Sequence, residues 1–153
     1  MVNETIRPAT ADDIEAITAL TRAAYAKWVP LIGREPLPMK ADYAEAFKKH
    51  RFDLLFTGSE MAALIETVPR NGDLLIENVA VSPAFRKRGY GRRLLALAEE
   101  HAREAGFPCI RLYTNALFEE NIKLYLALGY EIEREEPLNG GTAVHMRKDF
   151  ACA

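Results

Sequence analysis

Five basic side chains fall within eight positions of this 153-residue chain: Arg86, Lys87, Arg88, Arg92 and Arg93. Gly89 and Gly91 lie among them and would let the backbone approach a ligand closely. The first turn of a following helix leaves N–H groups without intrahelical partners, and such helix starts bind phosphate. The segment therefore predicts an anion site, with a solvated basic loop as the alternative interpretation.

The chain offers no convincing nucleophile for a covalent intermediate. Ser59 and Ser82 are not in a Gly-x-Ser-x-Gly turn, and Cys109 lies in an apolar stretch. Cys109 and Cys152 are the two cysteines, and their spacing fits neither a disulfide framework nor a metal site. We expect no covalent intermediate, no bound metal and a reducing, cytoplasmic location.

The elements that would position these residues follow from apolar periodicity and turn residues. Strands are expected at 5–9, 52–57, 61–68, 74–81, 110–114, 130–134 and 142–148, and helices at 10–25, 41–50, 89–105 and 117–128. Three prolines and a glycine within 28–39 indicate a shaped loop, and Asn139-Gly140-Gly141 indicates a turn. This order predicts an α/β (α+β) fold with a mixed central sheet of about seven strands and helices on both faces.

Composition narrows the class of protein. Hydrophobic residues make up 49% and charged residues 27%, as in folded globular domains, and the length suits one domain spanning 1–153. The formal net charge of -2 gives no general attraction to nucleic acid, and no apolar stretch approaches the roughly 18 residues of a membrane span. We expect neither a nucleic-acid nor a membrane partner.

Residues 74–91, LLIENVAVSPAFRKRGYG, resemble the central motif of the GNAT superfamily, the general-control-related N-acetyltransferases. That motif is an acidic and apolar strand, a short loop, then Arg or Gln, two residues, Gly, one residue, and Gly or Ala. Arg86, Gly89 and Gly91 match it. The segments 6–20 and 112–135 resemble other parts of the family, so the resemblance spans most of the chain and implies a GNAT-like fold.

The resemblance implies acetyl-CoA as co-substrate, with its pyrophosphate on the loop amides and its pantetheine arm along the preceding strand. The implied cofactor-binding residues are Val79, Ala80, Val81, Arg86, Lys87, Arg88, Gly89, Tyr90, Gly91 and Arg92. A backbone amide near 79–81 is implied to polarise the thioester carbonyl. The resemblance implies Asn121 as a further CoA contact, although Phe118 stands where the family usually has its asparagine, and Asn115 is a weaker candidate.

Tyr125 matches the tyrosine that protonates the departing CoA thiolate in many members of the family. It also falls in an apolar helical stripe, so a core aromatic is the alternative; the stripe is Leu117, Phe118, Ile122, Leu124 and Leu128. Strand alternation places Glu77, Val79 and Val81 on one face, where Glu77 could deprotonate the acceptor through water or simply pair at the sheet rim. His101 and His145 are weaker catalytic candidates.

The predicted function is transfer of an acetyl group from acetyl-CoA directly to the amine of a small molecule. The family builds its acceptor wall from the segment joining its first two helices, which makes Trp28, Arg34 and Met39 the substrate-binding candidates. Arg34 could bind a carboxylate or phosphate, or face solvent. A non-catalytic acyl-CoA-binding module, an acetyltransferase acting on a protein amine, and a homodimer stay open as alternatives.

Overall fold

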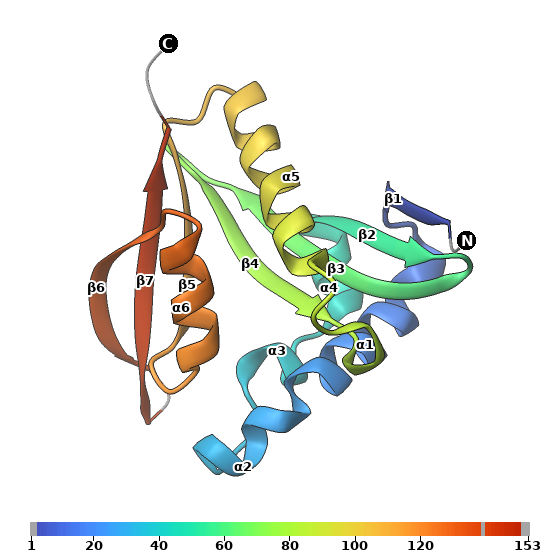
Figure 1. Ribbon diagram of the computed structural model, residues 1–153, viewed down its shortest axis with the longest axis horizontal. Helices are drawn as coiled ribbons and strands as arrows, with labels where there is room; N and C mark the ends of the chain where they lie inside the picture. The colour runs from blue at the N-terminus through green and yellow to red at the C-terminus, as the bar shows by residue number, and fades with distance from the viewer. Residues whose placement is uncertain (1–2, 139, 151–153) are drawn as a thin grey trace.

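The computed structural model describes residues 3–138 and 140–150 and contains one seven-stranded mixed sheet (Figure 1). The strands are β1 (Glu4–Pro8), β2 (Arg51–Thr57), β3 (Glu60–Pro69), β4 (Leu74–Val81), β5 (Cys109–Asn115), β6 (Glu131–Leu138) and β7 (Gly141–Asp149). They lie in the order β1-β2-β3-β4-β5-β7-β6, with every neighbouring pair antiparallel except β4 and β5. The predicted mixed sheet is confirmed. Asn139, the first residue of the predicted Asn139-Gly140-Gly141 turn, lies outside the described residues. The cysteine Cys152 lies outside them as well.

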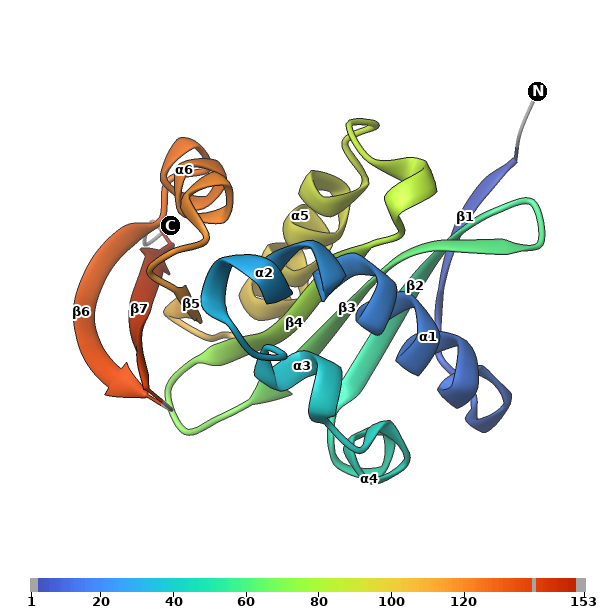
Figure 2. The same cartoon turned by 90° about the horizontal axis from the view of Figure 1, so that it is seen from below.

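Helices cover both faces of the sheet, as predicted. They are α1 (Ile14–Tyr25), α2 (Val29–Ile32), α3 (Leu37–Lys40), α4 (Tyr43–Lys49), α5 (Tyr90–Glu104) and α6 (Glu119–Ala127), with short 3₁₀ turns at Ala11–Asp13, Ala26–Trp28 and Pro83–Phe85. Helices α1 to α4 lie on one face, and α5 and α6 lie on the other (Figure 2). None of the helices in the described ranges is long and apolar enough to cross a membrane.

The sheet separates two apolar cores. On the α1 side, Ile17 and Leu54 are fully buried in a cluster that includes residues of α1, α4, β2 and β3. On the α5 side, Leu94 and Ile110 are fully buried in a larger cluster shared by α5, α6 and the central strands. Burial of these side chains, about 1.5 to 3 kcal/mol each, fixes both helical layers against a common scaffold.

The proline-rich segment 28–39 contains two single-turn helices, which the sequence analysis did not resolve. Proline is tolerated in a first helical turn because the N–H that it lacks would have no partner there. Both α2 and α3 carry a proline in that position, and Gly33, at a φ of 75°, ends α2. The prediction that residues 28–39 contain no long helix or strand is confirmed.

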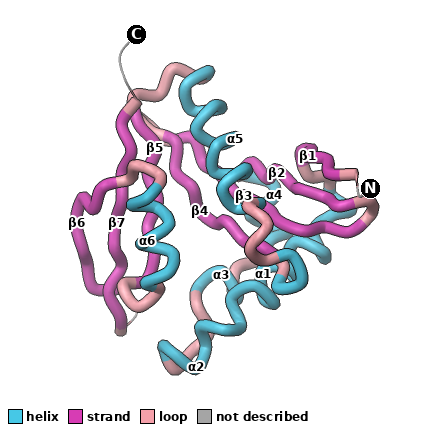
Figure 3. The backbone as a smooth tube through the Cα atoms, in the orientation of Figure 1, coloured by secondary structure: helices cyan, strands magenta, loops and turns pink. Residues whose placement is uncertain are grey.

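Strands β4 and β5 form the only parallel pair among the described strands, and they pair for only three residues. Leu74 to Ile76 lie beside Ile110 to Leu112, after which the two strands diverge. Figure 3 shows them adjacent near one end of the sheet and apart at the other, while β5 continues beside β7. The divergence exposes the backbone of one edge of β4 in the middle of the sheet.

A bulge in β4 corrects one prediction. Glu66 of β3 is opposite Asn78 and Thr67 is opposite Ile76, so Glu77 is an extra residue in its strand. A bulge interrupts the alternation of side chains between the two faces. Glu77 and Asn78 both line a cavity on the α1 side, whereas Val79 and Val81 pack into the α5-side core. The expectation that Glu77 shares a face with Val79 and Val81 was therefore wrong.

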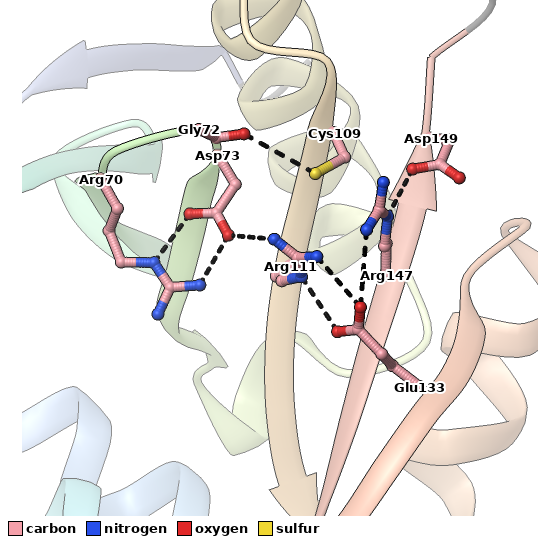
Figure 4. Close-up of polar contacts among 8 residues, drawn as sticks. All are labelled: Arg70, Gly72, Asp73, Cys109, Arg111, Glu133, Arg147 and Asp149. Carbon is pink, nitrogen blue, oxygen red and sulfur yellow. Dashed lines mark hydrogen bonds and ion pairs between the residues drawn. The ribbon is translucent and has the colours of Figure 1, made fainter.

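An ion-pair network joins the strands at the end where β4 and β5 still pair (Figure 4). Arg70 and Arg111 both donate to the buried carboxylate of Asp73, and Arg111 also donates to Glu133 on β6. Arg147 of β7 pairs with Glu133 as well. We call these five residues the strand-junction network, because they connect the turn before β4 with β5, β6 and β7 where backbone pairing is short.

Candidate active site

The loop before α5 presents a row of free backbone donors. Lys87 and Gly89 adopt left-handed φ values of 64° and 80°, and the first helical hydrogen bond runs from the Arg93 N–H to the Gly89 carbonyl at 3.0 Å. Within the described part of the chain, the N–H groups of residues 86–92 have no backbone partner. Such donors, with the positive end of the helix dipole behind them, favour an anion.

The basic side chains around this loop differ in their interaction partners. Arg93 pairs with Glu4, and the buried Tyr90 donates its hydroxyl to the same carboxylate at 2.6 Å. Tyr90 can therefore contribute only its backbone to an anion site. The Arg88 guanidinium lies 5.1 Å from the centre of the Phe85 ring. Arg86, Lys87 and Arg92 have no ion pair within the described residues.

The exposed edge of β4 begins beside this loop. The Ser82 N–H donates to the Ala62 carbonyl on β3, and alternate residues direct their backbone groups to opposite sides. Val79 and Val81 therefore present theirs on the side from which β5 has diverged. Ala80 faces β3 with its backbone and the α1-side core with its side chain, so it lies off this edge.

Tyr125 of α6 lies in the α5-side core with 6% of its surface exposed. Its ring packs against the Tyr130 ring at 5.9 Å, and burial raises the pKa of Tyr125 to about 12. The same core contains Val79 and Val81 of β4. On the other face, Tyr25 of α1 donates to the Val79 carbonyl at 3.4 Å, so the Tyr25 hydroxyl lies at the open edge of β4.

A cavity of ≈ 210 Å³ lies on the α1 face between the segment 25–43 and strands β4, β5 and β7. Glu77 lines it and accepts a hydrogen bond from Tyr113 at 3.2 Å. Burial, together with the charge of Glu77, raises the pKa of Tyr113 to about 12, so Tyr113 stays a donor. Glu77 is thus a positioned carboxylate in a largely apolar cavity.

Sequence reasoning missed Tyr25 and Asn78, which line this cavity. Tyr25 donates to the Asn78 side-chain carbonyl at 2.9 Å, and the Asn78 amide donates to Thr21 and Tyr43 at 3.4 Å each. Burial raises the pKa of Tyr43, so its hydroxyl is protonated at neutral pH. An asparagine within an apolar strand was the available signal, since a buried amide requires hydrogen-bond partners.

Of the three acceptor candidates, only Arg34 lines the cavity. Trp28 instead stacks on Phe118 at 4.3 Å, which joins the α1 side to the start of α6. Met39 is 7% exposed, because its single helical turn directs the side chain inward, and its backbone carbonyl accepts from Arg22. The other cavity residues of this segment are Tyr25, Ile32, Pro36, Leu37, Pro38, Ala41 and Tyr43.

The remaining candidates lie in different places. Asn121 is half-buried in the first turn of α6, and Asn115 lines the cavity. His145 contacts Glu136 at 2.6 Å. His101 lies beside Asp53 at 3.9 Å, eleven residues along α5 from its start, or about 16 Å. Leu117 precedes α6 and is 51% exposed, so it is not part of the predicted apolar stripe. No cluster of three metal-ligating side chains occurs in the ranges that the structure describes.

This chain belongs to the acetyltransferase (GNAT) family, whose model matches residues 16–130. The predicted family is therefore confirmed. The match includes β4, the loop before α5, and α6, which are the elements that surround the open strand edge.

The curated relatives match over part of their length. N-alpha-acetyltransferase 80 of Mus musculus is 35% identical over 79 residues, covering 52% of this chain and 23% of that protein. The uncharacterized N-acetyltransferase YjgM of Escherichia coli is 45% identical over 49 residues, covering 32% and 29%. The matched segments thus span less than a third of each of these two relatives.

Solved structures share the whole fold. The ribosomal-protein-S18-alanine N-acetyltransferase from Escherichia coli has a TM-score of 0.80 at 22% identity, covering 99% of this chain and 96% of that one. The PaiA N-acetyltransferase from Thermoplasma acidophilum, solved in complex with coenzyme A, has a TM-score of 0.78 at 18% identity, covering 97% and 99%. These likenesses establish the fold.

Proposed function

We propose that this protein is an acetyl-CoA-dependent N-acetyltransferase that transfers the acetyl group directly to the amine of a small molecule. The observation that carries the proposal is the divergence of β4 from β5. Free N–H groups, an open strand edge and the Glu77 cavity lie along β4, and Tyr125 shares the α5-side core with Val79 and Val81. Family membership supports the same reaction.

In this proposal the loop amides of residues 86–92 and the nearby arginines hold the CoA pyrophosphate. The pantetheine arm pairs with the free edge of β4 through Val79 and Val81. The arm then passes the start of α5 at Gly91, where a side chain would first meet Val81 at 3.7 Å. A cofactor bound there brings its thioester to the end of the cavity near Tyr125.

The chemistry requires a neutral amine, a polarised carbonyl and a protonated leaving group. Glu77 takes one proton from the acceptor ammonium through water, and the nitrogen then attacks the thioester carbon. A backbone N–H near Val79 to Val81 stabilises the oxyanion. As the carbon–sulfur bond breaks, the thiolate takes the Tyr125 proton, and the second amine proton returns to that phenolate. A tyrosine with a pKa of about 12 is protonated at neutral pH and can serve this role.

A small acceptor is favoured because α2 and α3 close one side of the cavity. The cavity volume of ≈ 210 Å³ is below the roughly 300 to 1,000 Å³ of sites for drug-sized ligands. The second candidate is a protein N-terminus, since similar proteins include an N-alpha-acetyltransferase and a ribosomal-protein-alanine acetyltransferase.

The test is release of CoA thiol from acetyl-CoA with single amines, amino acids and peptides. We expect turnover with small amines to exceed that with long basic peptides. Acetyl-CoA should also raise the melting temperature while adenosine does not, because the phosphates supply most of the binding. Stabilisation without turnover on any amine would favour the non-catalytic alternative, and faster turnover of peptides would favour the protein acceptor.

A further inference from the structure

We propose that the acceptor amine carries a carboxylate that binds Arg34, so that the acceptor class is small amino acids with an apolar side chain. The inference rests on the proposed acetyltransferase function and deepens it. It starts from the charges in the cavity. Arg34 and Glu77 are the two charged residues among those that line it.

Arg34 is unusual among the arginines of this chain. Nine of the 13 have a carboxylate oxygen within 4.0 Å. The four without one in the described residues are Arg34 in the cavity and Arg86, Arg88 and Arg92 at the start of α5. The last three surround the proposed phosphate site. By the same logic Arg34, half-buried and without a protein carboxylate, lies where a ligand anion would bind.

The Arg34 guanidinium lies beside Gly140 and Gly141, where β7 begins. A Cβ added at Gly141 would lie 3.1 Å from Arg34 Nη2 and 3.6 Å from Asn115 Nδ2. The missing side chain therefore lets two nitrogen donors converge on one point. The side-chain Oδ1 of Asn115 accepts from the Leu117 N–H, which fixes the amide with its donor end toward Gly141. A forked cation beside an amide donor suits a planar carboxylate.

The rest of the cavity selects among anionic amines. Glu77 is the second charge, and it attracts the acceptor ammonium while repelling a dianion. A single cation opposite a carboxylate thus matches a monoanionic carboxylate better than a phosphate. Most of the remaining wall is apolar, contributed by Ile32, Pro36, Leu37, Pro38, Phe118 and Leu138. An apolar side chain on the acceptor would contact these residues.

The experiment compares L-leucine, 3-methylbutylamine and L-leucinamide as acceptors for the wild-type enzyme, by release of CoA thiol. The second compound lacks the carboxylate and the third carries a neutral amide in its place. We expect kcat/KM for leucine to exceed that for 3-methylbutylamine by about 10- to 100-fold, the range for charge-assisted hydrogen bonds. Arg34→Gln should remove this preference by raising KM for leucine, with little change for the neutral amines.

Two further variants separate binding from general charge or folding effects. Lys40→Gln removes the same charge from an exposed position of α3 and should leave the leucine preference unchanged. Gly141→Ala retains the Arg34 charge but places a Cβ against its guanidinium, so it should raise KM for leucine selectively. Melting temperatures with acetyl-CoA report whether each variant folds and binds the co-substrate.

Equal use of leucine and 3-methylbutylamine by the wild type, unchanged in Arg34→Gln, would overturn this inference and leave the acetyltransferase function standing. Faster turnover of O-phosphoethanolamine than of leucine would show that Arg34 binds a phosphate rather than a carboxylate. Faster turnover of a peptide with N-terminal Asp than of one with N-terminal Asn, and than of every free amino acid, would indicate that the acceptor is a protein N-terminus. No thiol release with any acceptor would contradict the proposed function itself, and this inference with it.

Discussion

At the scale of single residues, the Tyr125 hydroxyl is the proposed proton donor to the departing thiolate. Its ring belongs to the α5-side core, and its pKa of about 12 keeps the proton in place at neutral pH. We predict that Tyr125→Phe lowers kcat by ~10²-fold or more and changes acetyl-CoA affinity by only a few fold, because a general acid acts when the thiolate departs. Steady-state rates and a direct binding titration would measure both.

Tyr130→Phe is the matched control for that variant. The Tyr130 hydroxyl is buried and donates to Glu99 at 3.2 Å, so its loss should lower the melting temperature without a comparable loss of kcat. If Tyr125→Phe instead melts early and turns over at the wild-type rate, its hydroxyl is structural. Solvent or another residue would then protonate the thiolate.

Glu77 gives a second prediction at this scale. Glu77→Gln keeps the size of the side chain and its capacity to accept from Tyr113, but it removes the proton acceptor. We expect kcat/KM to fall by ~10²-fold or more at neutral pH and to recover in part as rising pH deprotonates the free amine. Tyr113→Phe, which only releases the Glu77 carboxylate from its donor, should have a smaller effect. A flat pH profile in Glu77→Gln would contradict the assignment.

At the scale of elements, the sequence predicted nearly every helix and strand but not the bulge in β4. Alternation over 74–81 implies a regular strand, and a bulge at a glutamate carries no glycine to mark it. The bulge brings Glu77 and Asn78 to the same cavity. Its position depends on how β3 and β4 pair, which is a tertiary property. The residues proposed here as catalytic were therefore predictable by type and motif, whereas the face on which Glu77 lies was not.

A substitution at Gly91 tests whether acetyl-CoA binds along the start of α5. A Cβ there would lie 3.7 Å from Val81, an ordinary contact, and its φ is not left-handed. We predict that Gly91→Ala folds normally, with a stability change within about 1 kcal/mol. It should weaken acetyl-CoA binding by about tenfold or more, because the methyl group occupies the path of the phosphates and the pantetheine arm. Calorimetric titration and thermal melting would separate the two effects.

Arg103→Gln supplies the control at the far end of the same helix. It removes a cation from the last turn, where the side chain is 55% exposed, and should leave acetyl-CoA affinity unchanged. Wild-type affinity in Gly91→Ala would indicate that the ligand approaches α5 from another side. The proposed path along β4 would then be wrong.

At the scale of the whole molecule, the sheet must diverge at one end and stay closed at the other. Only three residue pairs join β4 to β5, so the strand-junction network adds side-chain connections where the backbone supplies few. Apart from the neighbouring pair Arg70 and Asp73, the members of this network are distant in the chain and meet only through the strand order, so the sequence could not predict it. The motif that identified the family lies at the other end of β4.

Asp73 connects β4 to β5 at the closed end of the sheet, and its replacement tests the whole arrangement. Hydrogen bonds from Arg70, and then from Arg111, hold the pKa of Asp73 below its usual range. We predict that Asp73→Asn destabilises the protein by ~1–3 kcal/mol at neutral pH, because two cations lose their shared partner. That is a fall in melting temperature of ~2–12 °C for a chain of this size.

The pH dependence of this loss follows from the sign of the shift. A carboxyl with a lowered folded-state pKa stabilises the fold above its unfolded pKa, near 3.9, and loses that contribution as the pH falls through the folded value. The difference between wild type and Asp73→Asn should therefore be largest at neutral pH and shrink below about pH 4. Asp149→Asn, whose carboxylate is 65% exposed, should cost less than about 1 kcal/mol at any pH. A constant difference from pH 7 to pH 3 in urea unfolding would show that Asp73 acts through packing rather than charge.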